Sequence, residues 1–163
     1  MSGGLPEIRV LLVEDNSVDV ELVKSLLHTT RPGQITVSHA ATLKDALVLL
    51  KAGKFSAILL DLSLSDGFGL ETFQQVHEMV PRMPIVVLSG FNDESVALKA
   101  IQAGAQDYLP KGEITGVVLV RTIFHAIERQ KLTSDLRLAA AEIKTLRQQL
   151  ENARETGQKK SGG

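Results

Sequence analysis

The sequence of 163 residues has no cysteine, so it can form neither disulfide bonds nor thiolate metal sites. Its 18 basic and 19 acidic residues leave a formal net charge of −1, which argues against a dedicated nucleic-acid-binding surface. No apolar run approaches the roughly 20 residues of a membrane-spanning helix, and the polar start Met1–Gly4 is not a signal peptide. We therefore expect a cytoplasmic protein without membrane insertion or direct nucleic-acid binding.

The chain does contain a regular alternation of short apolar runs and amphipathic stretches. The apolar runs have the length and composition of strands that are buried on both faces, and they cover residues 8–13, 35–40, 57–61, 84–88 and 107–109. Helical spacing follows each run, and the last helix starts near Ile114. Five strand–helix units in regular order predict an α/β fold with a parallel sheet and helices on both of its faces.

Capping residues indicate where three of the helices begin: Asn16 or Ser17, Thr42 with Asp45 in a capping box, and Asn92 or Asp93. Pro81 and Gly104 are expected to end the third and fourth helices. Residues 1–7 precede the first strand and are predicted to be disordered.

Polar side chains follow four of the predicted strands. Glu14 and Asp15 come after the first strand, Asp61 ends the third, Ser89 follows the fourth, and Lys111 follows the last. The carboxyl ends of parallel strands meet at one edge of a sheet, where open α/β folds bind their ligands. Each residue alone has an ordinary explanation as a cap, a turn residue or a surface lysine. Their joint occurrence favours a functional site.

These residues fit phosphoryl chemistry. The carboxylates of Glu14, Asp15 and Asp61 would repel one another if all were ionised close together, and a hard divalent cation such as Mg²⁺ removes that conflict. Asp61 could then attack phosphorus and form an aspartyl phosphate. Lys111 would neutralise the phosphoryl oxygens, and Ser89 would donate a hydrogen bond to one of them.

A resemblance to a known family rests on four segments: Leu11-Leu12-Val13-Glu14-Asp15-Asn16, Leu60-Asp61-Leu62-Ser63-Leu64-Ser65-Asp66-Gly67, Leu88-Ser89-Gly90 and Gly104-Ala105-Gln106-Asp107-Tyr108-Leu109-Pro110-Lys111. Through them the chain over residues 8–128 resembles the response-regulator receiver domain of two-component signalling. The resemblance implies a flavodoxin-like, doubly wound sheet of five parallel strands. It also implies a sensor histidine kinase or a phosphotransfer protein as partner, together with Mg²⁺-dependent self-phosphorylation and autodephosphorylation.

The resemblance assigns a role to each site residue. It implies that Asp61 is the phosphoacceptor, that Glu14 and Asp15 bind the metal with it, and that the backbone carbonyl of Ser63 is a further Mg²⁺ ligand. By the same resemblance Ser89 is the switch hydroxyl, Tyr108 the switch aromatic and Lys111 the phosphate-binding lysine.

Two positions depart from the family pattern. Gly112 follows Lys111 where the family usually has proline, often after a cis peptide bond, and Ser65 stands where many members have proline. A cis bond without proline costs about 2.5–4 kcal/mol. We therefore expect a trans bond here, with Gly112 supplying backbone freedom. The loop position of Lys111 predicts that its side chain is accessible to solvent.

The last helix should continue beyond the domain, because neither glycine nor proline interrupts residues 117–156. Its first apolar stripe suits the sheet and consists of Val117, Val120, Phe124 and Ile127. A second stripe with alternating spacings of four and three residues faces away from the domain. We predict a coiled-coil extension over residues 129–156, a disordered tail over residues 157–163, and a dimer seam of Leu132, Leu136, Ala139, Ile143, Leu146, Leu150 and Ala153.

In this heptad register Glu142 takes a g position and Arg147 the following e position, which slightly favours a parallel homodimer over an antiparallel one. Continued upstream, the register places Thr122, His125 and Arg129 in the seam.

Other functions fit the sequence less well. A haloacid-dehalogenase-like phosphatase would need a second acid two residues after Asp61, where Ser63 stands, and a flavodoxin would need a phosphate loop where Glu14 and Asp15 would repel the phosphate. His125 lies on a helix, but its neighbours do not resemble a kinase phosphoacceptor site. For the output, the alternative to dimerisation is that the chain is the N-terminal receiver and linker of a larger effector enzyme, a diguanylate cyclase or a histidine kinase.

Overall fold

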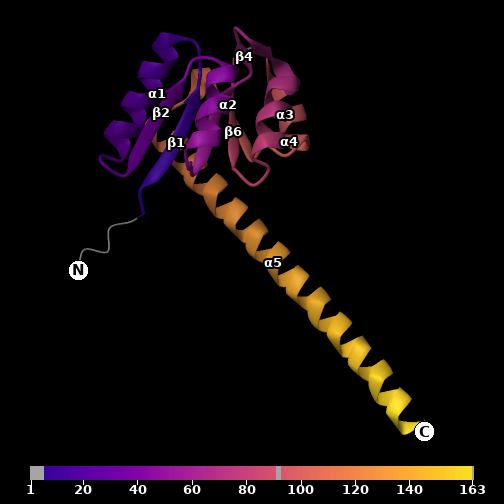
Figure 1. Ribbon diagram of the computed structural model, residues 1–163. Coiled ribbons are helices and arrows are strands. Elements are labelled where there is room, and N and C mark those ends of the chain that lie inside the picture. The colour runs from indigo at the N-terminus through magenta and orange to yellow at the C-terminus, as the bar shows by residue number, and fades with distance from the viewer. Residues whose placement is uncertain (1–5, 91–92, 163) are drawn as a thin grey trace. The chain divides into compact units, whose positions relative to one another are not determined.

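Five parallel strands form the central sheet of this computed structural model, which describes residues 6–90 and 93–162 (Figure 1). The strands stand in the order β2 (Ile35–Ala40), β1 (Ile8–Val13), β3 (Ala57–Asp61), β6 (Ile85–Ser89) and β7 (Asp107–Pro110). Every neighbouring pair is parallel. The predicted doubly wound five-stranded fold is confirmed.

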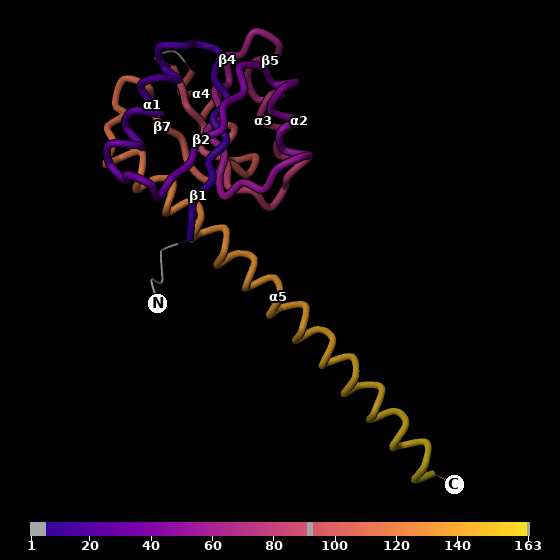
Figure 2. Tube along the Cα trace, turned by 60° about the vertical axis from the view of Figure 1, so that its left-hand side comes forward, coloured from indigo at the N-terminus to yellow at the C-terminus, as the bar shows by residue number. Residues whose placement is uncertain are grey.

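In the described part of the chain, five α-helices connect or follow these strands: α1 (Ser17–Thr30), α2 (Leu43–Ala52), α3 (Gly69–Met79), α4 (Glu94–Gln102) and α5 (Gly116–Ser161). Two hydrophobic cores lie on the two faces of the sheet. On one face buried residues of α2, α3 and α4 pack together, among them Ala46, Phe73 and Ala97. On the other face Val23 of α1 packs with Ile123 of α5. Figure 2 shows α1 and α2 on opposite sides of the strands.

The strands at the centre of the sheet are buried at every position. All five residues of β3 and all five of β6 are buried, which requires apolar side chains on both faces of each strand. The polar exceptions are the last residues of these strands, Asp61 and Ser89, and both are only 2% exposed. The strand sequence therefore carries these two polar groups to the carboxyl edge of the sheet.

Two of the predicted helix caps are present. The side chain of Asn16 accepts hydrogen bonds from the backbone N–H groups of Val18 and Asp19, and that of Thr42 accepts one from Asp45. Asp93 takes the N-cap position of α4, but its side chain makes no capping hydrogen bond. Asn92, the other predicted cap of α4, lies outside the described residues.

A short hairpin follows β3 and was not predicted. It pairs β4 (Ser63–Leu64) with β5 (Gly67–Phe68) in antiparallel orientation. Two-residue strands are too short for an alternating pattern to show in the sequence. Gly69 then starts α3 with a φ of +67°, a conformation that side chains other than glycine rarely adopt.

The sheet-facing side of α5 differs from the prediction at its first residue. Val117 is 69% exposed, so its assignment to the buried stripe is wrong. The fully buried residues are Leu119, Ile123 and Ala126, with Val120 at 5% exposure. Val117 instead lines a groove of about 460 Å³ between the end of α1 and the first turns of α5.

The chain divides into two compact units, the first ending at Gln130 and the second beginning at Lys131. This division lies two residues after the predicted end of the domain at Glu128. Helix α5 continues to Ser161, so residues 157–161 are helical where the sequence predicted a disordered tail. A single glycine costs a helix only about 1 kcal/mol, and Lys159 and Lys160 interact favourably with the helix C-terminus. Among the described residues no helix has the length and apolar character needed to cross a membrane.

Candidate functional site

Three carboxylates meet at the carboxyl edge of the sheet. Glu14 and Asp15 directly follow β1, and Asp61 is the last residue of β3. One carboxylate oxygen from each lies within 4.8 Å of the other two. Glu14 is 0% exposed and Asp61 is 2% exposed, whereas Asp15 is exposed. The structure thus brings together the three acids that the sequence predicted for a metal site.

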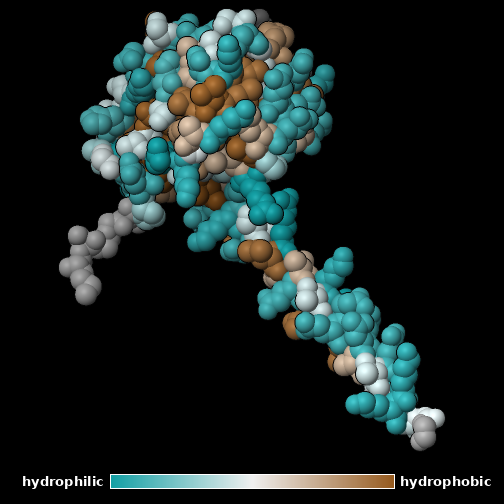
Figure 3. Space-filling model, viewed as in Figure 1, coloured by the Kyte–Doolittle hydropathy of each residue, from teal (hydrophilic) through white to brown (hydrophobic). Residues whose placement is uncertain are grey.

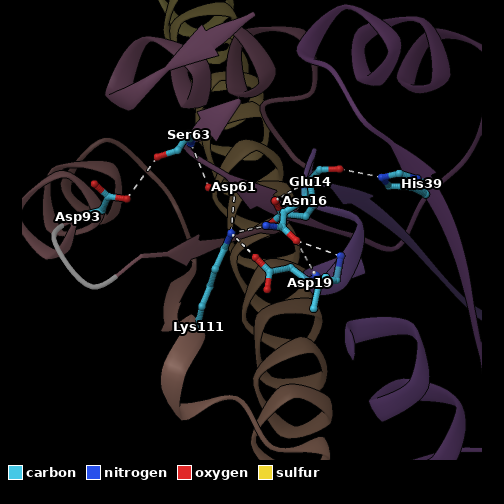
Figure 4. Close-up of polar contacts among 9 residues, drawn as sticks. Glu14, Asn16, Asp19, His39, Asp61, Ser63, Asp93 and Lys111 are labelled. Atoms are coloured by element: carbon cyan, nitrogen blue, oxygen red, sulfur yellow. Dashed lines mark hydrogen bonds and ion pairs between the residues drawn. The ribbon is translucent and has the colours of Figure 1, made fainter. Parts of the chain in front are cut away.

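Lys111 lies among the acids, as Figure 4 shows. Its Nζ is 2.7 Å from Glu14 Oε2, 3.0 Å from Asp19 Oδ2 and 3.1 Å from Asp61 Oδ2. The lysine side chain is only 24% exposed. The lysine is therefore only partly accessible to solvent, less than the loop position led us to expect, because its ammonium group contacts three carboxylates.

The backbone around Lys111 agrees with one expectation and departs from another. No cis peptide bond occurs among the described residues, as predicted for this loop. Gly112 has no left-handed φ, and a Cβ added to it would meet no atom within 4 Å. The loop therefore does not use the conformational freedom of Gly112. Pro110 ends β7, and a short 3₁₀ helix, η1 (Lys111–Glu113), follows it.

Burial controls the charge state of the site. Desolvation of the buried carboxyl raises the pKa of Glu14 from 4.5 to about 7, although the contacts with Lys111 and the N–H of Asn16 partly lower it. Burial lowers the pKa of Lys111, but its contacts with Glu14, Asp19 and Asp61 outweigh that effect and hold this pKa above its usual value. The lysine is therefore charged at neutral pH, while Glu14 titrates near neutrality.

The raised pKa of Glu14 predicts a pH-dependent stability in metal-free protein. The folded state holds the Glu14 proton more tightly than the unfolded state does. The stability that protonated Glu14 contributes is therefore fully present below pH 4.5 and is lost as pH rises through about 7. Glu14→Gln should remove this loss of stability at high pH. It should stabilise the metal-free protein at pH 8 by about 1–3 kcal/mol relative to wild type. Urea unfolding at pH 5 and pH 8 in a chelator measures the difference. Glu21→Gln, at an exposed acid of α1, is the control, and an equal gain there would contradict the assignment.

The donor set fits a hard divalent cation. The Oε1 of Glu14 accepts a hydrogen bond from the Asn16 N–H at 3.0 Å. The buried Oε2 has the Lys111 ammonium at 2.7 Å, yet no hydrogen bond of good geometry reaches it, so the contact is an ion pair that leaves lone pairs free. Carboxylate oxygens at this spacing are ligands that Mg²⁺ prefers, with water completing its coordination.

Two residues of the site were missed from the sequence. Asp19 lies in the first turn of α1, one helical turn after Asp15, and a spacing of four residues could have indicated that it reaches the site. His39 lies in β2 beside β1, and its Nε2 donates a hydrogen bond to the backbone carbonyl of Glu14 at 2.7 Å. No sequence signal pointed to His39, because its contact depends on the pairing of β1 with β2.

The remaining predicted residues lie on β4, β6 and β7. The N–H of Ser63 donates to Asp61 Oδ1 at 3.0 Å. Ser89 is buried at the end of β6, and Tyr108 in the neighbouring β7 is half-buried. Both line a hollow of about 270 Å³ with Gly90 and Glu94. Space therefore exists beside Ser89 into which an aromatic side chain could move.

This arrangement can support nucleophilic attack by Asp61 on a phosphoryl group. Asp61 would supply the nucleophilic oxygen, and Glu14, Asp15 and the backbone carbonyl of Ser63 could hold the cation with it. Lys111 provides a positive charge within 3.1 Å of Asp61. In phosphoryl transfer a protein mainly positions groups and stabilises charge, and these residues can do both.

Lys111→Ala should destabilise the metal-free protein by about 1–3 kcal/mol, because Glu14 and Asp61 would remain buried without a cation. Added Mg²⁺ should restore most of the loss by supplying positive charge at the same place. Thermal melts with chelator and with Mg²⁺ measure both effects. Lys51→Ala, at an exposed lysine of α2, is the matched control. An equal loss with and without Mg²⁺ would mean that Lys111 stabilises the fold by packing instead of by charge.

Comparison with known proteins identifies relatives over the same part of the chain. The response regulator receiver domain family matches residues 10–123. The KDP operon transcriptional regulatory protein KdpE of Escherichia coli (strain K12) is 36% identical over 103 residues, which cover 63% of this chain and 44% of KdpE. The C4-dicarboxylate transport transcriptional regulatory protein DctD of Rhizobium meliloti (strain 1021) is 29% identical over 128 residues, 78% of this chain and 27% of DctD. The chain thus spans less than half the length of these curated relatives.

Solved structures share the fold. A response regulator receiver domain protein from Clostridium thermocellum superposes with a TM-score of 0.69 at 24% identity, over 77% of this chain and 98% of that one. A CheY-like receiver domain protein from Methanospirillum hungatei JF-1 gives a TM-score of 0.68 at 23% identity, over 78% and 99% of the two chains. At these identities the similarity concerns the fold alone.

Proposed function

The chain belongs to the response regulator receiver domain family, and on this basis we propose that Asp61 accepts a phosphoryl group in a Mg²⁺-dependent reaction. The donor would be a phosphohistidine of a sensor histidine kinase or a phosphotransfer protein, in the cytoplasm. The observation that carries the proposal is the convergence of Glu14, Asp15, Asp61 and Lys111 at one edge of the sheet. The match to the response regulator receiver domain family supports this class of partner.

The residues of the chain would act as follows. An Asp61 carboxylate oxygen attacks phosphorus as the P–N bond of the phosphohistidine breaks. Glu14, Asp15, Asp61 and the Ser63 carbonyl would hold Mg²⁺, and the cation would supply positive charge next to the phosphoryl oxygens. Lys111 leaves its contacts with Glu14 and Asp61 and pairs with a phosphoryl oxygen.

Two residues would then report the phosphorylated state. The Ser89 hydroxyl, buried at the end of β6, donates a hydrogen bond to the phosphoryl group. Its movement opens space in the hollow that it shares with Tyr108, and the half-buried tyrosine turns inward. The family match and the hollow that both residues line support these two roles.

The output would pass through the second unit as a homodimer. Along residues 132–150 the large apolar side chains of the predicted seam are between 53% and 71% exposed: Leu132, Leu136, Ile143, Leu146 and Leu150. Figure 3 shows hydrophobic patches recurring along this otherwise hydrophilic helix. When a second copy covers such a stripe at coiled-coil spacing, the burial of its apolar side chains stabilises the pair of helices.

The seam would begin after the receiver unit. The register places Thr122 in the seam, but Thr122 is only 7% exposed within the first unit. Arg129 forms an ion pair with Asp107 at 3.4 Å. The proposed coil would therefore start at Leu132 and have about three heptads, near the lower limit for stability. Phosphorylation of the receiver unit could therefore change the strength or the register of this coiled coil.

The alternative is that the chain is the receiver and linker of a longer effector enzyme, a diguanylate cyclase or a histidine kinase. The observation in its favour is that the curated relatives extend well beyond the matched region. A stop codon directly after the codon for Gly163 in the natural gene would exclude it. A continuing reading frame that encodes such a domain would support it.

The phosphorylation proposal is tested by incubating the protein with acetyl phosphate and Mg²⁺ and measuring intact mass. We expect a gain of one phosphoryl group, and no gain when a chelator removes the metal. Labelling that is equal with and without Mg²⁺ would contradict the proposed metal site, and no labelling under any condition would contradict the proposed phosphoacceptor.

A further inference from the structure

Asp93 is an acid next to the site to which the proposed function gives no role. Its Oδ2 accepts a hydrogen bond from Ser63 Oγ at 3.3 Å, and the side chain is half-buried. Among the described residues no cation lies within ion-pair distance of this carboxylate. Figure 4 shows Asp93 and Ser63 on one side of Asp61, with Glu14 and Asn16 on the other. In this view the Asp93 carboxylate thus lies on the side of Asp61 opposite to Glu14.

The local backbone holds Asp93 in this position. Asp93 is the N-cap residue of α4, yet its side chain does not accept from the free N–H groups of that helix. An aspartate at this position usually does so. The Asp93 N–H donates to the Gly90 carbonyl at 3.2 Å, and a Cβ at Gly90 would lie 3.2 Å from Asp93 Oδ2. Because Gly90 has no side chain, the Asp93 carboxylate can turn toward Ser63 instead of toward its own helix.

Ser63 links this carboxylate to the reacting group. Its N–H donates to Asp61 Oδ1 while its hydroxyl donates to Asp93. Phosphatases that use a strand-end aspartate as nucleophile carry an acid two residues later, and Ser63 stands at that position in this chain. Through its hydrogen bond with Ser63, the carboxylate of Asp93 lies next to the position at which such phosphatases carry their second acid.

We propose that Asp93 is a catalytic residue for hydrolysis of the phosphoryl group on Asp61, where its carboxylate binds and orients the attacking water. This inference rests on the proposed function of Asp61. It assigns to Asp93 and Ser63 the control of how long the phosphorylated state lasts.

The hydrolytic step would proceed with a water molecule hydrogen-bonded to Asp93 and directed at phosphorus. The water oxygen forms a bond to phosphorus, and the bond between phosphorus and the Asp61 oxygen breaks. The electron pair of the broken bond stays on Asp61, which returns to a carboxylate. The water proton passes to Asp93 and then to solvent, and inorganic phosphate leaves. Ser63 acts as a positioning residue, because its hydroxyl fixes the Asp93 carboxylate.

The test compares the lifetime of the phosphorylated protein in the full chain. Wild type and Asp93→Asn are labelled with acetyl phosphate and Mg²⁺, the donor is removed by desalting, and the loss of the phosphoryl group is followed by intact mass. Asparagine keeps the oxygen that accepts from Ser63 but cannot take a proton. We expect the lifetime to increase by roughly ten- to hundred-fold, a usual range for loss of a proton acceptor. Ser63→Ala should lengthen it less.

Two controls separate this role from a structural one. Glu71→Gln removes one negative charge at an exposed site in the first turn of α3 and should leave the lifetime unchanged. Wild-type hydrolysis should be slower by about two-fold in D₂O because a proton moves in the rate-limiting step, and this measurement needs no variant. An Asp93→Asn lifetime within two-fold of wild type, a shorter one, or the absence of a solvent isotope effect in wild type would overturn the proposal. Failure of wild type to take up a phosphoryl group would instead contradict the role of Asp61.

Discussion

Asp61→Asn is expected to abolish phosphoryl uptake completely. Asparagine has nearly the same shape as aspartate, but its amide oxygen is too weak a nucleophile to displace the donor group from phosphorus. Intact mass after treatment with acetyl phosphate and Mg²⁺ should rise by one phosphoryl group in wild type and not at all in the variant. The same contrast should hold when a phosphorylated histidine kinase serves as donor.

Asp45→Asn is the control for this experiment, because Asp45 is an exposed acid in the first turn of α2. It should be labelled like wild type. Equal labelling of wild type and Asp61→Asn would show that the phosphoryl group is attached elsewhere. Asp61→Asn should also remain folded, since it removes one charge from a crowded acidic site, and a thermal melt in the presence of chelator checks this.

The full chain should be a dimer, and a chain that ends at Gln130 should be a monomer. The seam residues are exposed in a single chain, and pairing two helices removes them from water at about 25 cal/mol per Å² of apolar surface. Two of the d positions, Ala139 and Ala153, bury less surface than leucine and each forgoes very roughly 2 kcal/mol. We therefore expect a dimer that dissociates on dilution. Light scattering over a range of concentrations measures the mass.

Two leucines of the same helix provide a matched pair for this test. Leu146 lies on the seam and is 56% exposed, whereas Leu138 lies off the seam and is 68% exposed. Leu146→Asp should give a monomer, because the charge would be buried between two helices. Leu138→Asp should leave the dimer intact. If both variants and the shortened chain have the mass of wild type, the stripe is not the dimer seam.

The charges beside the seam favour a parallel arrangement. Asp135 and Glu142 occupy g positions, and Arg147 and Arg154 occupy e positions. In a parallel pair each g position faces an e position of the partner, so that Glu142 meets Arg147, whereas an antiparallel pair would bring like charges together. Because the chain has no cysteine, Ala139→Cys introduces a single thiol. Oxidation should link two parallel chains through it, and an antiparallel pair would give no link.

The parts of the fold that the sequence predicted correctly are those with strong periodicity. Buried strands such as β3 and β6 are apolar at nearly every position, and their polar ends identified Asp61 and Ser89. The acids of the site could be predicted because parallel strands end at the same edge. The expected roles of Ser63 as a metal ligand and of Ser89 and Tyr108 as switch residues, and the class of partner, came from resemblance to a family and not from periodicity.

The errors concern contacts that depend on tertiary structure. The partial burial of Lys111 could not be predicted, because its environment is set by acids that lie 50 to 97 positions earlier in the chain. The first turn of α5 was assigned by apolar character, and Val117 proved exposed since the packing of a helix start depends on its neighbours in α1. The hydrogen bond between Ser63 and Asp93 likewise connects β4 with the N-cap of α4, two positions that are far apart in sequence.

The contrast between buried β3 and β6 and the exposed second half of α5 has a consequence for amide hydrogen exchange. The amides of β3 and β6 should exchange only when the whole first unit unfolds, so that their exchange rates report its global stability. Amides beyond Gln130 lie in a helix whose side chains are largely exposed, and they should exchange through local fraying. Their protection would then depend on protein concentration wherever a second copy covers the helix, while that of the strands would not.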